Sequence, residues 1–170
     1  MPSLSSAHIT VVGPGGPDLL LVPGLTATTR LTAAETGGPS IVEHVFSPRC
    51  LVPPHRHTVE DEISYVVEGK IGFRSDGNEV VLGAGGYIVK PRGELHSMWN
   101  AGPLPARMIE IINPAGFENY FVDLAATVAA NGGRPEPAVT APVAERYGLS
   151  FDLGEVPELV ARYGLIAPGR

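Results

Sequence analysis

Apolar and polar residues between positions 41 and 112 follow the pattern of short β-strands separated by turns. Asp76-Gly77-Asn78 and Ala84-Gly85-Gly86 are tight-turn sequences with β-branched residues on either side. The strands that this pattern predicts are 41–46, 63–68, 71–75, 79–82, 87–90, 96–100 and 106–112. Short strands joined by turns at regular spacing indicate a mainly β protein, built as an antiparallel barrel or jelly roll.

The pattern changes to helical spacing after Asn113-Pro114. Apolar residues recur every three or four positions from Phe117 to Val128, and Gly132-Gly133 ends the predicted helix. A proline-rich linker (134–142) and two short helical segments (142–147 and 155–163) follow. We therefore expect three parts: an extended arm or edge strands over 1–40, a barrel over 41–113, and a helical extension over 114–170 that packs on the barrel.

Composition excludes several classes of protein. Charged residues make up 18% of the 170 residues, the net charge is −6, and lysines and arginines are scattered, which argues against a nucleic-acid partner. The single cysteine, Cys50, excludes an intramolecular disulfide and fits a reducing compartment. Residues 1–12 lack the pattern of a signal peptide, and no apolar run approaches the roughly 20 residues of a membrane span. We expect a soluble, cytoplasmic protein with no membrane partner.

Four potential metal ligands occur in the predicted barrel. His55 and His57 are two positions apart, so in a strand both imidazoles point to the same face. Glu62 follows after five residues, and His96 comes after the next predicted hairpin and turn. Three imidazoles and a carboxylate suit one divalent transition metal, with Fe, Mn, Ni, Co, Cu and Zn all compatible.

The spacing of these ligands resembles a known family. His55-x-His57-x4-Glu62-x6-Gly69, followed by Gly85-x5-Pro91-x-Gly93-x2-His96-x3-Asn100, is similar to the two sequence motifs of the cupin superfamily. One departure is Arg49, which stands where the first motif usually has glycine. The resemblance implies a double-stranded β-helix, the jelly-roll cupin barrel, with its metal held by His55, His57, Glu62 and His96. Residues 57–69 also resemble small single-domain cupins of the quercetinase-like dioxygenase type.

Strand alternation suggests which residues surround the metal. Counting from His96 and Glu62 places Met98, Asn100, Ser64 and Val66 on the inner face. Tyr65 and Phe73 are predicted either to line the cavity or to pack between the sheets. The alternative for the whole set is ordinary barrel core. The candidate substrate-binding residues are Ser64, Tyr65, Val66, Phe73, Met98 and Asn100.

Several neighbouring residues are predicted to have structural roles only. Glu60 and Asp61 are interpreted as solvated loop charges, and His44 as structural or surface. We expect Trp99 and the aromatic residues of the first helix to belong to the core or to a dimer interface.

The leading functional hypothesis is a metal-dependent oxygenase that combines dioxygen with a small aromatic or enolisable hydroxy-carbonyl substrate. Glu62 either acts only as a ligand or also takes a proton from the substrate. One alternative is an oxygen-independent isomerase, lyase or cyclase, and another is a non-enzymatic cupin that binds a small molecule. The resemblance and the apolar N-terminal arm also predict a homodimer.

Overall fold

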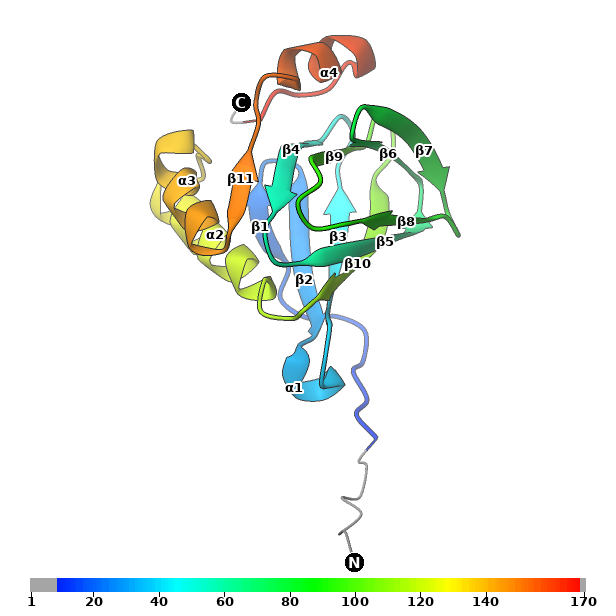
Figure 1. Cartoon of the computed structure of the whole chain (residues 1–170), viewed down its shortest axis with the longest axis vertical. Coiled ribbons are helices and arrows are strands. Elements are labelled where there is room, and N and C mark those ends of the chain that lie inside the picture. The colour runs from blue at the N-terminus through cyan, green and yellow to red at the C-terminus, as the bar shows by residue number, and fades with distance from the viewer. Residues whose placement is uncertain (1–8, 169–170) are drawn as a thin grey trace, which may run out of the picture.

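Two antiparallel β-sheets face each other in the computed structural model, which describes residues 9–168 (Figure 1). The six-stranded sheet has the order β1 (Leu19–Val22), β2 (Leu25–Leu31), β3 (Ser40–Phe46), β10 (Ala106–Asn113), β5 (Asp61–Glu68) and β8 (Tyr87–Lys90). The five-stranded sheet has the order β11 (Leu149–Phe151), β4 (Leu51–His57), β9 (His96–Trp99), β6 (Lys70–Ser75) and β7 (Asn78–Gly83). The predicted jelly roll is thereby confirmed.

Side-chain alternation directs one face of each strand into the space between the sheets. In β3, Ser40, Val42, His44 and Phe46 are buried while the residues between them are partly exposed. β4 departs from this regularity, with a register shift against β9 between Val52 and His55. The shift coincides with Pro53-Pro54, which cannot donate hydrogen bonds to a neighbouring strand. Beyond it, the two histidines of β4 face the interior.

Four helices accompany the sheets: α1 (Ala33–Thr36), α2 (Glu118–Ala130), α3 (Pro137–Arg146) and α4 (Val156–Tyr163). Helices α2 and α3 lie together beside β1 and β11, and α4 lies above the five-stranded sheet in this view, packed on Leu51 of β4 and Trp99 of β9 (Figure 1). The main core fills the space between the sheets and continues under α2. A second apolar cluster under α4 contains Leu51, Trp99, Leu159 and Leu165.

Three details differ from the sequence-based expectation. Part of the predicted linker is helix α3, which starts at Pro137 because proline is well suited to the first turn of a helix. The three-residue strand β11 was not predicted, and it pairs with the end of β4 that carries His55 and His57. Helix α1 was also not predicted, although Thr32 and Glu35 form a capping box at its start.

No helix in the described part of the chain combines the length and apolar character that a membrane crossing requires.

Candidate metal centre

The four predicted ligands meet at one point inside the barrel. His55 and His57 come from β4, Glu62 from β5 and His96 from β9. One nitrogen or oxygen atom of each lies within 4.8 Å of those of the other three, and all four side chains are buried. His55 and His96 are direct cross-strand partners, so the pairing of β4 with β9 fixes their relative position. Residues from both sheets therefore surround a single interior point.

Hydrogen bonds on the outer side of each imidazole orient the rings. Nδ1 of His55 lies 2.8 Å from the carbonyl oxygen of Pro53, and Nδ1 of His96 lies 3.0 Å from that of Glu94. A carbonyl oxygen only accepts, so each Nδ1 carries the proton and each Nε2 keeps a free lone pair. This outer hydrogen bond is what metal-binding histidines usually make.

The side chain of Glu60 lies beside Nδ1 of His57, as the backbone carbonyl oxygens lie beside Nδ1 of the other two histidines. The prediction that Glu60 is a solvated loop charge was wrong. Its side chain is buried, and Oε2 lies 3.4 Å from Nδ1 of His57. Asp61 does lie at the surface, where it pairs with Arg92. The turn that brings Glu60 to His57 has no distinctive sequence. The three-residue spacing between them is the only feature of the sequence that points to this contact.

Two buried polar atoms at the centre form no hydrogen bond within residues 9–168: Oε2 of Glu62 and Nε2 of His96. They lie 3.2 Å apart, and Oε2 is 2.9 Å from Nζ of Lys90, but none of these contacts has hydrogen-bond geometry. The ion pair with Lys90 offsets part of the charge on Oε2 of Glu62, whereas Nε2 of His96 has no partner among the described residues, and an unpaired buried acceptor costs about 1–3 kcal/mol. A cation between the four ligands would satisfy both atoms, so these residues fit a metal ion.

The protonation of the ligands also suits a metal. Burial lowers the pKa of His55 well below its usual value, and burial likewise lowers that of His96. Burial alone would raise the pKa of Glu62, but the charge of Lys90, the largest opposing cause, outweighs it together with the neighbouring imidazoles and lowers the pKa. Neutral imidazoles and an ionised carboxylate are the metal-binding forms of these groups.

A buried charge network continues from Glu62 into the barrel. Nζ of Lys90 lies 2.9 Å from Oε2 of Glu62 and 2.9 Å from Oε2 of Glu110. Ser64 donates a hydrogen bond of 2.9 Å to Oε1 of Glu110. Burial raises the pKa of Glu110 to about 7. The sequence analysis did not identify Lys90 or Glu110, although Glu110 has the inward parity of Met108 and Ile112 in β10.

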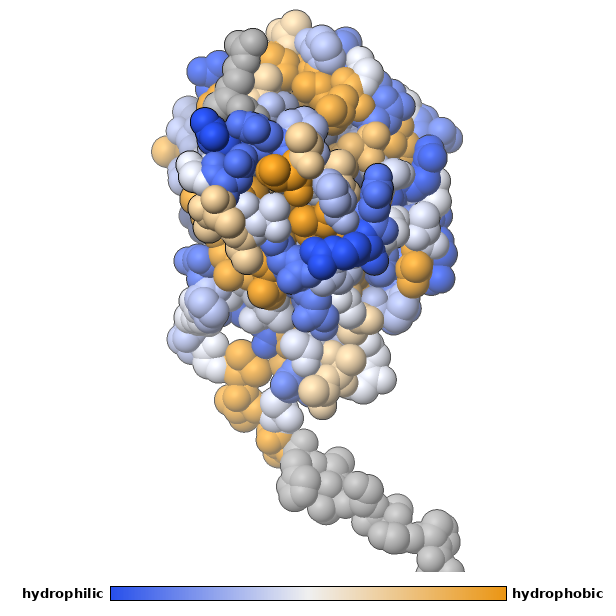
Figure 2. All heavy atoms as spheres, turned by 90° about the vertical axis from the view of Figure 1, so that its left-hand side faces the viewer, coloured by the Kyte–Doolittle hydropathy of each residue, from blue (hydrophilic) through white to orange (hydrophobic). Residues whose placement is uncertain are grey.

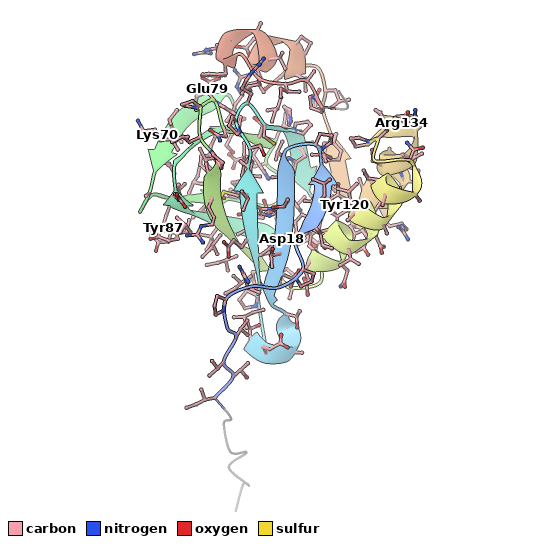
Figure 3. The ribbon with its side chains drawn as sticks, turned by 180° about the vertical axis from the view of Figure 1, so that it is seen from behind. Asp18, Lys70, Glu79, Tyr87, Tyr120 and Arg134 are labelled. Carbon is pink, nitrogen blue, oxygen red and sulfur yellow. The ribbon has the colours of Figure 1, made fainter. Side chains whose placement is uncertain are left out.

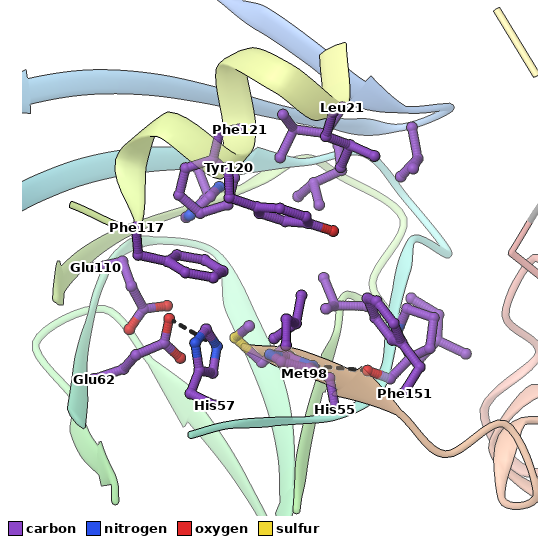
Figure 4. Close-up of a pocket in the computed structure, with 18 of the residues that line it drawn as sticks. Leu21, His55, His57, Glu62, Met98, Glu110, Phe117, Tyr120, Phe121 and Phe151 are labelled. Atoms are coloured by element: carbon purple, nitrogen blue, oxygen red, sulfur yellow. Dashed lines mark hydrogen bonds and ion pairs between the residues drawn. The ribbon is translucent and has the colours of Figure 1, made fainter. Parts of the chain in front are cut away.

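A cavity of about 100 Å³ adjoins the ligands (Figure 4). His55, His57 and Glu62 border one side of it, and Met98 and Glu110 also line it. Most of the remaining lining is apolar and comes from both sheets, α2 and β11; it includes Leu21, Phe46, Leu124, Leu149 and Phe151. The arrangement offers a metal centre at one end of an apolar chamber.

Of the six predicted substrate-binding residues, all of them described, only Met98 lines this cavity. Val66 and Phe73 are fully buried core residues. Ser64 bonds Glu110, and the Asn100 amide donates to backbone carbonyl oxygens in loops. Tyr65 lies on the outer face, with its ring centroid 4.5 Å from that of Tyr87.

Two groups interpreted as structural do line the cavity. Phe117, Tyr120 and Phe121 project from the start of α2, and the Phe117 ring centroid lies 4.4 Å from that of His57. His44 lines the interior as well, packed edge-on against Phe121. Helical periodicity shows that the three aromatic residues share a face but does not show which part of the barrel that face covers, so the sequence analysis could not place them.

The fold and the ligand set define the class of protein: a jelly-roll barrel with a candidate His₃Glu metal centre. Residues 42–112 match the family model described as Cupin domain. The solved structure of an RmlC-like cupin from Shewanella frigidimarina superposes with a TM-score of 0.56 at 23% identity, covering 67% of this chain and 96% of that one. The superposition shows that the two proteins share a fold, and the family match is confined to the barrel.

Two curated relatives have names that point to different activities. Oxalate oxidase GF-3.8 of Triticum aestivum is 31% identical over 131 residues, which cover 69% of this chain and 58% of its own length. Tetracenomycin polyketide synthase protein TcmJ of Streptomyces glaucescens is 33% identical over 93 residues, covering 54% of this chain and 62% of its own. The chain spans about half the length of the curated relatives it matches.

Proposed function

We propose that this protein is a metal-dependent oxygenase that acts on a small aromatic or enolisable hydroxy-carbonyl substrate. The observation that carries the proposal is the position of the four-ligand centre at one end of an apolar cavity whose lining includes several aromatic rings. Four protein ligands leave positions open for substrate or dioxygen. A bound divalent transition metal would supply Lewis acidity and a redox route to dioxygen.

The lining favours an apolar substrate over a small dianion. One relative is an oxalate oxidase by name, and oxalate carries two negative charges. No lysine or arginine lines the cavity within the described chain, and the nearby Lys90 is already paired with Glu62 and Glu110. Apart from the metal itself, the described lining of the chamber offers a dianion no positive charge, so part of the desolvation cost of the dianion would remain. An aromatic ring with an oxygen function at one end matches the lining better.

The protein's own residues would prepare such a substrate. Phe117 covers His57 and, with Phe121, gives an aromatic surface against which a ring packs. The apolar walls exclude water around the reacting end. Glu62 is the carboxylate nearest to an incoming hydroxyl, and Lys90 holds it ionised, so it is available to receive the hydroxyl proton.

The experiment compares oxygen uptake by wild type and Glu62→Gln, each loaded with Fe²⁺, on 4-methylcatechol and on acetylacetone. We expect uptake with at least one of them, and about 10²-fold less in the variant, within the range typical for loss of a general base. Anaerobic turnover of these compounds by the wild type would contradict the oxygenase and support the oxygen-independent alternative, for which the polyketide synthase relative is the supporting comparison.

We also propose that two copies of the chain associate. Ile9 and Val11 are 91% and 84% exposed. They belong to the segment before β1, which extends away from both sheets (Figures 1 and 2). Tyr87 and Val89 are 65% and 60% exposed on β8, an edge strand (Figure 3). A second copy would supply a partner surface for both sets. Sedimentation as a monomer would contradict this proposal.

A further inference from the structure

The hydroxyl of Tyr120 is a polar group inside an otherwise apolar wall. Tyr120 belongs to α2, is only 6% exposed, and lines the cavity. Its phenol projects from the helix across the cavity, toward the side that Phe151 borders (Figure 4). Within residues 9–168 no protein group forms a hydrogen bond with this hydroxyl, whereas the Tyr147 hydroxyl donates to Asp123 over 2.8 Å.

The Tyr120 side chain is buried, but its hydroxyl faces the open space of the cavity and has no protein partner there among the described residues. Buried tyrosines normally find a hydrogen-bond partner, which a molecule that enters the cavity can supply. The two other rings that α2 places in this wall, Phe117 and Phe121, show that phenylalanine packs here. Burial raises the pKa of Tyr120, so the hydroxyl keeps its proton and can donate it. The hydroxyl is therefore available to donate to an acceptor oxygen of a molecule in the cavity.

The position of Tyr120 relative to the metal centre indicates how a ligand would lie. His55, His57 and Glu62 border one part of the cavity, while Tyr120 approaches from the α2 wall (Figure 4). A cavity of about 100 Å³ is of the order of the apolar cavity of about 150 Å³ that holds one benzene ring. The chamber is therefore close to the size of one aromatic ring, and its lining includes candidate metal ligands as well as Tyr120.

We propose that Tyr120 is a substrate-binding residue that selects single-ring aromatic substrates with a second oxygen function. The substrate would present adjacent oxygens to the metal centre and a carbonyl or ether oxygen to the Tyr120 hydroxyl. The proposal rests on the proposed function, because it places the first pair of oxygens at the four-ligand centre. In this proposal the barrel binds the metal-coordinating end of the substrate, and Tyr120 of the helical extension selects for the second oxygen function.

The test uses two catechols that differ in the acceptor. Protein loaded with Co²⁺ is titrated under argon with 4-methylcatechol and with methyl 3,4-dihydroxybenzoate, and each dissociation constant is read from the visible spectrum. Wild type should bind the ester about tenfold more tightly, the gain expected of one added hydrogen bond of about 1.4 kcal/mol. Tyr120→Phe should bind the two catechols equally.

Tyr147→Phe is the matched control. Tyr147 packs edge-on against Tyr120, but it does not line the cavity and its hydroxyl already has a partner. This variant should keep the tenfold preference. Thermal unfolding gives a second readout: Tyr120→Phe should unfold no lower than wild type because it loses no protein hydrogen bond, while Tyr147→Phe loses its bond to Asp123 and should unfold at a lower temperature.

The outcomes separate this inference from the function on which it rests. A preference that survives in Tyr120→Phe, or equal binding of both catechols by wild type, overturns the role of Tyr120. If oxygen uptake with 4-methylcatechol is then still observed, the proposed function stands without it. Failure of Co²⁺-loaded wild type to bind either catechol overturns both the inference and the aromatic substrate.

Discussion

The barrel and the helical extension contribute opposite walls of the cavity, and their chemistry differs. The barrel side carries the four ligands and the network of Lys90 and Glu110, all buried and ionisable. The extension side carries Phe117, Tyr120 and Phe121, with a single polar atom that faces the cavity. Segments far apart in the chain thus divide the site into a reactive wall and a selective wall.

This division has a physical basis. Metal ligands must be held within a few tenths of an ångström, and paired strands provide that rigidity through many backbone hydrogen bonds. The shape of a cavity wall is set by packing, which tolerates substitution as long as volume and apolar character are kept. We therefore expect changes in the barrel wall to affect metal content, and changes in the extension to affect ligand choice or stability while metal content is kept.

The largest expected effect is on the reactive wall. His96→Ala removes one of the four ligands, so metal content should fall from about one equivalent toward zero. Loss of a residue that only hydrogen-bonds to a ligand typically lowers metal affinity about 10–100-fold, and loss of a ligand itself should cost more. Elemental analysis of the purified protein measures it. His44→Asn changes a buried histidine that is not in the ligand cluster and should retain the metal. Equal metal in wild type and His96→Ala would refute the candidate centre.

A core change in the extension should have the opposite signature. Leu159 of α4 is fully buried in the second apolar cluster, beside Trp99 and away from the ligands. Leu159→Ala should destabilise the protein by about 2–5 kcal/mol, as is usual for a cavity-forming change. Urea unfolding measures this loss, and metal content at low temperature should match wild type. Loss of metal without loss of stability would show that the two regions are coupled.

A smaller effect on the metal is expected from the group that supports His57. Glu60→Gln keeps the size of the side chain but removes the negative charge beside Nδ1 of His57. Metal affinity should fall by about tenfold, the lower end of the range for such partners. Competition with a chromogenic chelator measures it. Asp61→Asn, at the neighbouring surface position, is the control and should leave the affinity unchanged.

The parts of this arrangement that the sequence predicted are those with local signals. The ligands follow from strand parity and from two motifs with fixed spacing, so they can be identified before any tertiary contact is known. The strands of the barrel follow from turn sequences that set their ends. In each case the information lies within a few residues of the feature, and the burial of the four ligands agrees with it.

The parts that were not predicted depend on contacts between distant segments. Glu110 pairs with Lys90 across 20 positions, and a charged residue in a strand does not show by itself that it will be buried. The aromatic residues of α2 have helical spacing, but their place over the metal centre depends on how α2 packs on β1. For Tyr65 the error is the opposite one, because an interior position was predicted for a residue on the outer face. Its neighbour Ser64 points inward, so strand alternation directs Tyr65 outward.

The smallest expected effect concerns His44, which lies between the two walls. Burial lowers its pKa from 6.5 to about 4, and Nδ1 lies 3.2 Å from the Thr26 carbonyl oxygen. Between pH 6.5 and 4 the unfolded chain binds the proton that folded His44 excludes, so stability is fully present above pH 6.5 and declines as the pH falls toward 4. At pH 5.5 this single group should cost about 1 kcal/mol.

His44→Asn replaces the titrating ring with a neutral amide that can still donate to Thr26. Metal-free wild type and variant are compared by urea unfolding at pH 8 and pH 5.5. The variant should lose about 1 kcal/mol less than wild type between these two values, while His55 and His96, whose pKa values are also lowered, continue to destabilise both proteins in acid. Identical pH dependence in the two proteins would mean that His44 is hydrated through the cavity, which would place water along the boundary between the reactive and the selective wall.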